Sequence, residues 1–193
     1  MKKITLLLLM CFWCFSGFSQ LSEGFEGAAL PASGTWTLGS GSWAVFDNGV
    51  GLTNTWTANS GVAVPPLVYE GTRAAFMNGA QDNIGAGNTA QDWLVTPAVT
   101  VPANGQLRFF ARQTISGDQG TVYQIRISTT SQTNASSFTV LQQWTEPALN
   151  STFNVYEEKV VPLGLPAGST VYVAFVMVVT QPGASISADR WLV

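Results

Sequence analysis

The stretch Asp92-Trp93-Leu94-Val95-Thr96-Pro97 decides the fold class, because it has the pattern of a buried β-strand with marked ends. An acid and a tryptophan open a short apolar run, and a threonine and a proline close it. Proline has no backbone N–H to donate to a sheet, so it marks the end of the strand. Upstream of this stretch the chain is rich in loop residues, and downstream short apolar runs alternate with turns. The stretch therefore predicts an all-β protein with a regular second half.

The second half contains the clearest strand patterns. Residues 121–128 alternate, with Tyr123, Ile125 and Ile127 on the face that we expect to be buried. Residues 170–180 are apolar on both faces, which is typical of a strand in the middle of a covered sheet. Further strands are expected at 106–113, 138–144, 155–163 and 186–193. Short strands separated by turn clusters predict a β-sandwich or barrel.

The first half is predicted to hold shorter strands and longer loops. Short β segments are expected at 21–27, 36–38, 43–46 and 73–77. Between Asp47 and Gly71 the chain is polar and contains a Pro-Pro pair, which predicts a long surface loop with one edge strand. Loops of this length are often functional. We expect a single β-sandwich domain over residues 21–193, with its last strand truncated at Val193.

Residues 1–20 have the pattern of a secretory signal peptide. Two lysines precede an apolar run that is too short to favour a membrane span of about 20 residues. Both cysteines, Cys11 and Cys14, lie in this run, and we expect cleavage near Ser19 or Gln20. The mature chain would then have no cysteine and no histidine. We therefore predict a secreted or cell-surface protein that has no disulfides and is stabilised by its core.

The charge and the missing residue types exclude several functions. Loss of Lys2 and Lys3 leaves six basic residues against eleven acidic ones, a net charge near −5. This argues against nucleic-acid binding and against attraction to anionic membranes. Without histidine or cysteine, triad catalysis and imidazole or thiolate metal sites are excluded. Glu157 and Glu158 are neighbours in a predicted strand, so they cannot face each other as the carboxylates of a glycoside hydrolase do. We predict that the chain is not an enzyme.

A series of short motifs runs through nearly the whole mature chain. In chain order they are Gly24-Phe25-Glu26-Gly27 with Trp36, Asp92 to Pro97, Leu107-Arg108-Phe109, Tyr123 to Thr129, Val161-Pro162-Leu163 and Gly168 to Phe175. In this order they resemble the cleaved-adhesin and choice-of-anchor J domains of exported Bacteroidetes proteins. The resemblance implies a jelly-roll β-sandwich, similar to MAM-type and galactose-binding-like domains. It also implies adhesion or accessory binding, stabilisation by calcium, and no catalysis.

The resemblance places calcium ligands on the first and last strands, which lie side by side in jelly rolls of this kind. Glu26 and Asp189 are the candidates, and Asp47 and Asp92 are weaker additions. The alternative is that these are ordinary acids of loops and strand edges, because calcium needs about six to eight oxygens. The family closes with an acidic pair in its last strand, whereas here Arg190 follows Asp189.

Trp56 is the best exposed candidate for contact with a ligand, because it lies in the long polar loop. The alternative is that it anchors the loop or the core. We predict a secreted or surface-displayed binding or adhesion module for an extracellular glycan or protein. Two alternatives stay open. One is an accessory domain of a larger exported peptidase or glycoside hydrolase, whose catalytic part lies outside this chain, and the other is a structural spacer.

Overall fold

The strand at the centre of the prediction is β5 (Thr89–Val95), which lies inside the larger of two antiparallel sheets. It pairs with β2 (Gly41–Asp47) on one side and with β11 (Thr170–Thr180) on the other. Ala90 and Leu94 face the interior of the sandwich, whereas Trp93 and Val95 belong to a smaller cluster on the other face of the sheet. Both faces of β5 are therefore covered, as its apolar run requires.

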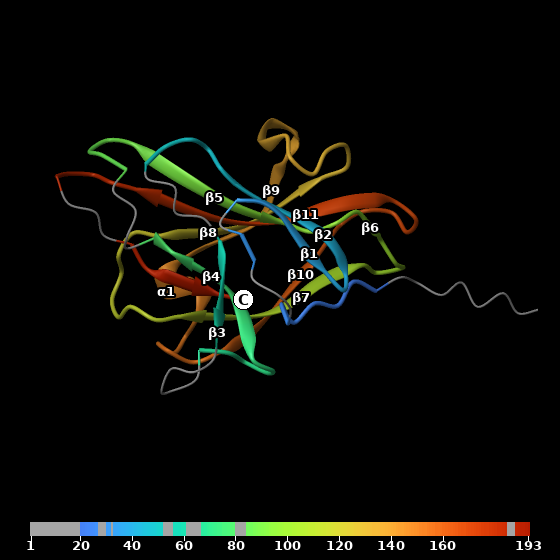
Figure 1. Ribbon diagram of the computed structural model, residues 1–193, viewed down its shortest axis with the longest axis horizontal. Helices are drawn as coiled ribbons and strands as arrows, with labels where there is room; N and C mark the ends of the chain where they lie inside the picture. Colours follow the sequence, from blue (N-terminus) through green and yellow to red (C-terminus); the bar gives the residue numbers. More distant parts are fainter. Residues whose placement is uncertain are drawn as a thin grey trace, which may run out of the picture.

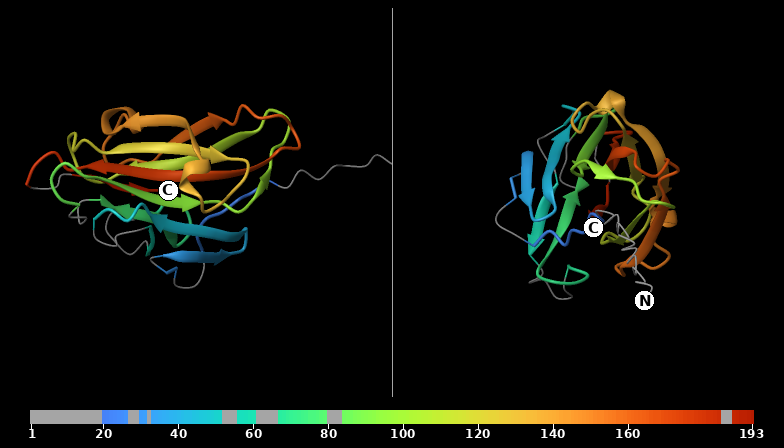
Figure 2. Two further views of the ribbon diagram at one scale, coloured as in Figure 1. Left: turned by 90° about the horizontal axis from the view of Figure 1, so that it is seen from above. Right: turned by 90° about the vertical axis from the view of Figure 1, so that its right-hand side faces the viewer.

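The structure is a computed structural model, which describes residues 20–26, 30–31, 33–51, 56–60, 67–79, 84–184 and 188–193. Two sheets pack face to face in it (Figures 1 and 2). This arrangement confirms the predicted all-β jelly-roll sandwich. The predicted signal peptide, except Gln20, lies outside the described residues.

The first sheet runs from the N-terminal strands to β9. Its order is β1 (Gly34–Leu38), β2, β5, β11, β8 (Val122–Ser128) and β9 (Thr139–Thr145), and β6 (Val99–Thr100) pairs with one end of β11. β11 is the long strand that is apolar on both faces, and its interior residues are buried as predicted. It lies between β5 and β8, where a strand buried on both faces belongs.

The second sheet carries the strands that border the candidate site. Its order is β10 (Glu157–Pro162), β7 (Gln106–Gln113), β12 (Arg190–Leu192), β4 (Arg73–Asn78) and β3 (Thr57–Ser60). β3 is the edge strand expected inside the long loop. The described residues include one short α-helix, α1 (Glu146–Leu149), and a 3-10 turn (Ala135–Ser137). No helix there is long and apolar enough to cross a bilayer.

The core between the sheets is dominated by aromatic side chains. Trp191, on the short strand β12, is fully buried and lies at its centre. Its ring is 5.0 Å from that of Tyr123, 5.2 Å from that of Trp56 and 6.0 Å from that of Phe175, centroid to centroid. Strands of both sheets therefore meet at one side chain, and edge-to-face contacts of this kind add to the hydrophobic gain.

The N-terminal segment differs from the prediction. A first strand was expected at 21–27, but residues 20–26 form no strand. Phe25 has a φ of 58°, which takes it out of the extended region, and its N–H donates to Glu23 Oε1 at 2.7 Å instead of to a neighbouring strand. The segment is nevertheless fixed, because the Phe25 ring packs edge-on against Trp36 and Trp43.

Candidate ligand-binding site

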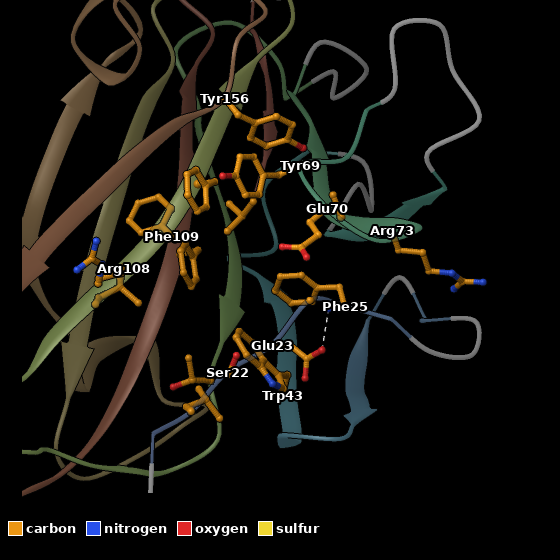
Figure 3. A pocket seen from close by; sticks show the side chains of 18 residues that line it. Ser22, Glu23, Phe25, Trp43, Tyr69, Glu70, Arg73, Arg108, Phe109 and Tyr156 are labelled. Carbon is orange, nitrogen blue, oxygen red and sulfur yellow. Dashed lines mark hydrogen bonds between the residues drawn. The ribbon is translucent and has the colours of Figure 1, made fainter. Parts of the chain in front are cut away.

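A cleft of about 360 Å³ opens between the two sheets beside the N-terminal segment (Figure 3). Trp43 and Phe175 line it from the first sheet, and Phe109 lines it from β7 of the second. Phe25 contributes a further aromatic ring. The lining is therefore mainly apolar and aromatic, which is the usual character of a ligand pocket.

Three aromatic residues, Tyr69, Phe110 and Tyr156, form what we call the aromatic rim of this cleft. The Tyr69 ring stacks on the Phe110 ring, with centroids 3.7 Å apart and planes inclined by 11°. Tyr156 packs edge-on against Tyr69 at 5.6 Å, and its hydroxyl donates to the carbonyl of Leu67. Tyr69 is nevertheless 54% exposed. One face of the Tyr69 ring is held by Phe110, and the side chain still presents a large exposed surface.

Two acidic and two basic side chains line the cleft, Glu23, Glu70, Arg73 and Arg108. Figure 3 shows the Glu70 carboxylate turned toward the cleft and the Arg73 guanidinium turned away from it. Arg108 is engaged by Glu158, with Nη2 2.6 Å from Oε1. Glu23 also lines the cleft, where it accepts hydrogen bonds from the Phe25 N–H and the Ser40 hydroxyl. A ligand in this cleft meets aromatic faces and carboxylates.

The aromatic rim was not predicted from the sequence, although the position of Phe110 could have indicated part of it. Phe110 alternates with Arg108 and Arg112 on the outer face of β7, and an aromatic between two arginines on a polar face is unusual. Tyr69 and Tyr156 are far apart in the chain, and no local pattern indicates that their rings meet. Only the fold brings the three together.

The exposure predicted for Trp56 is wrong. Its side chain is fully buried, its Nε1 donates to the carbonyl of Asp92 at 3.1 Å, and its ring packs against Trp191. The indole is apolar and large, so it gains by burial in the core, where a backbone oxygen satisfies its one donor. Trp56 is a core residue in this structure, which leaves no ring face for a ligand to contact.

Glu26 closes the turn before β4. Its carboxylate accepts hydrogen bonds from the backbone N–H groups of Thr72 and Arg73 and from the Thr72 hydroxyl. These bonds, first that of the Thr72 hydroxyl, hold the pKa of Glu26 below its ordinary value. Gly71 adopts a φ of +76°, and a Cβ there would collide with the Glu26 carboxylate, so the turn requires glycine.

Asp189 lies in a buried polar cluster at the other end of β4. Its side chain is fully buried, and Oδ1 accepts from the N–H groups of Ile115 at 2.8 Å and Arg190 at 2.6 Å. Oδ2 accepts from the Tyr123 hydroxyl at 3.1 Å. The Asp189 carbonyl accepts a hydrogen bond from the N–H of Gly79, just after β4. The Glu26 carboxylate accepts one from the N–H of Arg73, the first residue of β4. The expectation that Glu26 and Asp189 lie side by side is therefore wrong, because about 20 Å of extended chain separates Arg73 from Gly79.

Asp47 and Asp92 are brought together. They are direct cross-strand partners in the antiparallel pair of β2 and β5. Asp92 is 2% exposed, and Asp47 is half-buried and accepts from the Gly49 N–H at 2.6 Å. Within the described residues no group of three or more acidic, histidine or cysteine side chains is arranged to hold a metal. The four predicted ligands thus do not form one site, and only this pair shares a location.

The buried carboxyl groups of Asp189 and Glu146 make the free energy of unfolding depend on pH. Burial raises the pKa of Asp189 and of Glu146 above their ordinary values of 3.8 and 4.5. A raised pKa means that the folded state binds protons more tightly, so this contribution to stability is complete below pH 3.8 and is lost as pH rises through the raised values. Asp189→Asn keeps an acceptor for the N–H groups and removes the titration. We expect a shallower fall of its urea midpoint with rising pH, and parallel curves for the two proteins would contradict the assignment.

Comparison with known proteins identifies a family and similar solved structures. The family model described as Cleaved Adhesin Domain matches residues 19–180. Among solved structures, the K1 cleaved adhesin domain of Lys-gingipain from Porphyromonas gingivalis is 21% identical with a TM-score of 0.55, over 89% of this chain and 95% of that one. The K3 domain of the same protein is 18% identical with a TM-score of 0.52, over 78% and 87%. No curated protein matches the chain.

Proposed function

The chain belongs to the cleaved adhesin domain family, and from this premise we propose that it is an exported, non-catalytic module that binds an extracellular glycan at the aromatic rim. Secretion or surface display, and the absence of catalysis, are parts of this proposal. The alternative, that this chain is an accessory domain of a larger hydrolase, depends on residues outside this chain and stays a prediction.

One observation carries the proposal, the Tyr69 ring held on Phe110 at the mouth of the cleft. A sugar ring presents a face of C–H groups that stacks on an aromatic plane, whose face is electron-rich. Because the Tyr69 ring is already held in place, binding costs little side-chain entropy. Glu70 lies next to it and offers acceptors for sugar hydroxyls. A protein ligand would also find an aromatic anchor here, so the assay must include both classes.

A glycan array tests the proposal. We expect the folded mature chain to retain a related set of glycans, and the heat-unfolded chain to retain none. A matched protein panel, such as extracellular matrix proteins immobilised at the same density, provides the second arm. Retention on the protein panel alone would contradict the glycan proposal and leave the aromatic rim as a protein-binding site. Retention on neither would contradict a binding role for this domain.

Calcium is proposed only at Asp47 and Asp92. Like charges directly opposite each other across two strands destabilise a sheet, and burial of Asp92 makes the repulsion more costly. A hard cation between them would offset this cost and take its remaining oxygens from backbone carbonyls and water. These residues thus fit part of a calcium site, and the ion would act on stability and not on chemistry.

Thermal melting tests the calcium proposal. With calcium at about 100 times its dissociation constant, we expect the melting temperature to exceed that in chelator by about 5–10 °C. Asp47→Asn should abolish this difference, whereas Asp118→Asn, an exposed acid in another loop, should keep it. Identical melting of the wild type with calcium and with chelator would remove the metal from the account.

A further inference from the structure

The first sheet carries a cation on the side that faces away from the core. We call this side the outer face, and Trp93 and Val95 lie on it. Arg126 of β8 lies there too, because it alternates with Ile125 and Ile127, which belong to the interior cluster. The guanidinium carbon of Arg126 is 4.6 Å from the centre of the Trp93 ring. The positive charge is thus held over an aromatic plane, which attracts it.

No strand of this sheet that neighbours Arg126 places an acid on the outer face. β8, β9 and β11, which the structure describes in full, contain no acidic residue. The acids of β2 and β5 are Asp47 and Asp92, and they alternate with Phe46 and Trp93 of the outer face, so they belong to the interior side. Within the described residues Arg126 accordingly forms no ion pair, although the mature chain is acidic overall. An anionic ligand would meet a cation here and no opposing carboxylate.

Neutral amides hold the guanidinium in place. Arg126 Nε donates to Gln124 Oε1 at 2.7 Å, and Nη1 donates to Gln91 Oε1 at 3.2 Å. The Gln124 amide is itself fixed, because its Nε2 donates to Gln143 Oε1 at 2.6 Å. Burial lowers the pKa of Arg126 below its ordinary value, since its charge is only partly solvated. A bound anion would offset this cost, and the preset side chain would lose little entropy on binding.

The remaining polar groups of this site are donors. Arg126 Nη2 donates to no acceptor in the described part of the chain, and it is not shut off from solvent. The Nε1 of Trp93, in the ring under the guanidinium, is buried and also has no acceptor among the described residues. Such a set of donors requires a ligand rich in acceptors. A carboxylate fits, because it accepts several hydrogen bonds and its plane matches the planar guanidinium.

An aromatic surface lies beside the cation. The Phe46 ring stacks on the Trp93 ring, with centroids 5.4 Å apart and planes inclined by 15°, and Phe46 is only half-buried. The C–H face of a sugar packs on such a ring. A uronic acid carries its carboxylate directly on the sugar ring, so one rigid unit supplies both contacts. An acidic peptide would have to immobilise a flexible side chain to do the same, which costs entropy.

We propose that the outer face is a second binding site, which takes an acidic polysaccharide through a uronic acid residue. The carboxylate binds the Arg126 guanidinium, and the sugar ring packs against Phe46. This site is separate from the aromatic rim, whose Phe110 belongs to β7 of the second sheet. The proposal does not rest on glycan binding at the rim, so each site can fail in experiment without the other.

A pair of matched sugars tests the proposal by calorimetric titration into the full mature chain. One is a glucuronic acid trisaccharide, and the other is the glucose trisaccharide with the same linkage, which has a hydroxymethyl group in place of each carboxylate. We expect the acidic sugar to bind at least about tenfold more tightly, because hydrogen bonds between charged groups are the strong ones. Raising the salt concentration should reduce this difference.

Variants of the protein assign the effect to one side chain. Arg126→Gln should bind the acidic sugar at least about tenfold more weakly than the wild type, and Arg126→Lys, which keeps the charge and loses the planar fork, should lie between them. Lys159→Gln removes the same charge from β10 of the other sheet and should bind as the wild type does. Tyr69→Ala should also leave this binding unchanged. Melting curves report whether each variant folds, and the two sugars compare binding on the unaltered protein.

Four results would overturn the proposal. The first is no measurable binding of the acidic sugar, or equal affinity for the acidic and the neutral one. The second is full affinity of a folded Arg126→Gln variant, since the carboxylate would then bind elsewhere. The third is tighter binding of the corresponding sulfated trisaccharide, which would replace the carboxylate by a sulfate ester. The fourth is tighter binding of a capped peptide, Gly-Glu-Gly-Glu-Gly, which would make the outer face a protein-binding site.

Discussion

Replacing Trp191 by alanine is expected to lower the free energy of unfolding by about 3–5 kcal/mol, the range for large aromatic residues in protein cores. The indole is fully buried and contacts the rings of Trp56, Tyr123 and Phe175. Tyr123 and Phe175 belong to strands of the first sheet and Trp191 to a strand of the second, so no single strand can move to fill the cavity. Urea unfolding followed by circular dichroism measures the loss.

Phe153→Ala is the matched control for this prediction. Phe153 is also aromatic, but it is 49% exposed, so its removal leaves no cavity and should change stability by no more than about 0.5 kcal/mol. Trp56→Ala should resemble the Trp191 variant, because both indoles belong to one buried pair. If Trp191→Ala unfolded with a loss below about 1 kcal/mol, the two sheets would not share the core described here.

Replacing Tyr69 by alanine is expected to weaken glycan binding at least about tenfold, with the fold intact. The ring is 54% exposed and stacks on Phe110 through one face, so its loss removes contact with the ligand and uncovers Phe110 without opening the core. A central aromatic that anchors a ligand is commonly worth about 2 kcal/mol or more, and each 1.4 kcal/mol changes affinity about tenfold.

Two control variants separate stacking on the Tyr69 ring from the effect of its hydroxyl and from the loss of any exposed side chain. Tyr69→Phe keeps the stacked ring and removes only the hydroxyl, so its affinity should stay within about threefold of the wild type. Val140→Ala removes a side chain that is 51% exposed on β9 of the other sheet, and it should bind as the wild type does. Equal losses for Tyr69→Phe and Tyr69→Ala would assign the contribution to the hydroxyl and not to stacking.

The strands could be predicted where their pattern is local. β7 and β11 have the bounds that alternation and a two-sided apolar run predict, because each side chain's face follows from its position in the strand. β5 begins at Thr89, before the stretch from Asp92 that the sequence indicates, because its first residues pair with the end of β11 despite their polar character. The burial of Trp56 was missed, because a loop side chain is covered by residues that are distant in sequence.

The candidate site could be predicted only in part, for the same reason. The register of β2 and β5 brings Asp47 and Asp92 together, but Glu26 and Asp189 lie at opposite ends of β4. Glu26 binds backbone N–H groups of a turn that depends on Gly71, and Asp189 binds those of the 114–115 segment. Short acidic motifs do not show whether a carboxylate is held by N–H groups or left for a cation. The aromatic rim combines three distant segments, and sequence patterns do not describe such a combination.

The most direct measurement of the central claim is a calorimetric titration of the strongest glycan from the array into the wild type, Tyr69→Ala and Val140→Ala at one pH and salt concentration. The account predicts equal affinity for the wild type and Val140→Ala, and at least about tenfold weaker binding for Tyr69→Ala with an unchanged melting temperature. Equal affinity of all three proteins would contradict it, because the ligand would then bind away from the aromatic rim.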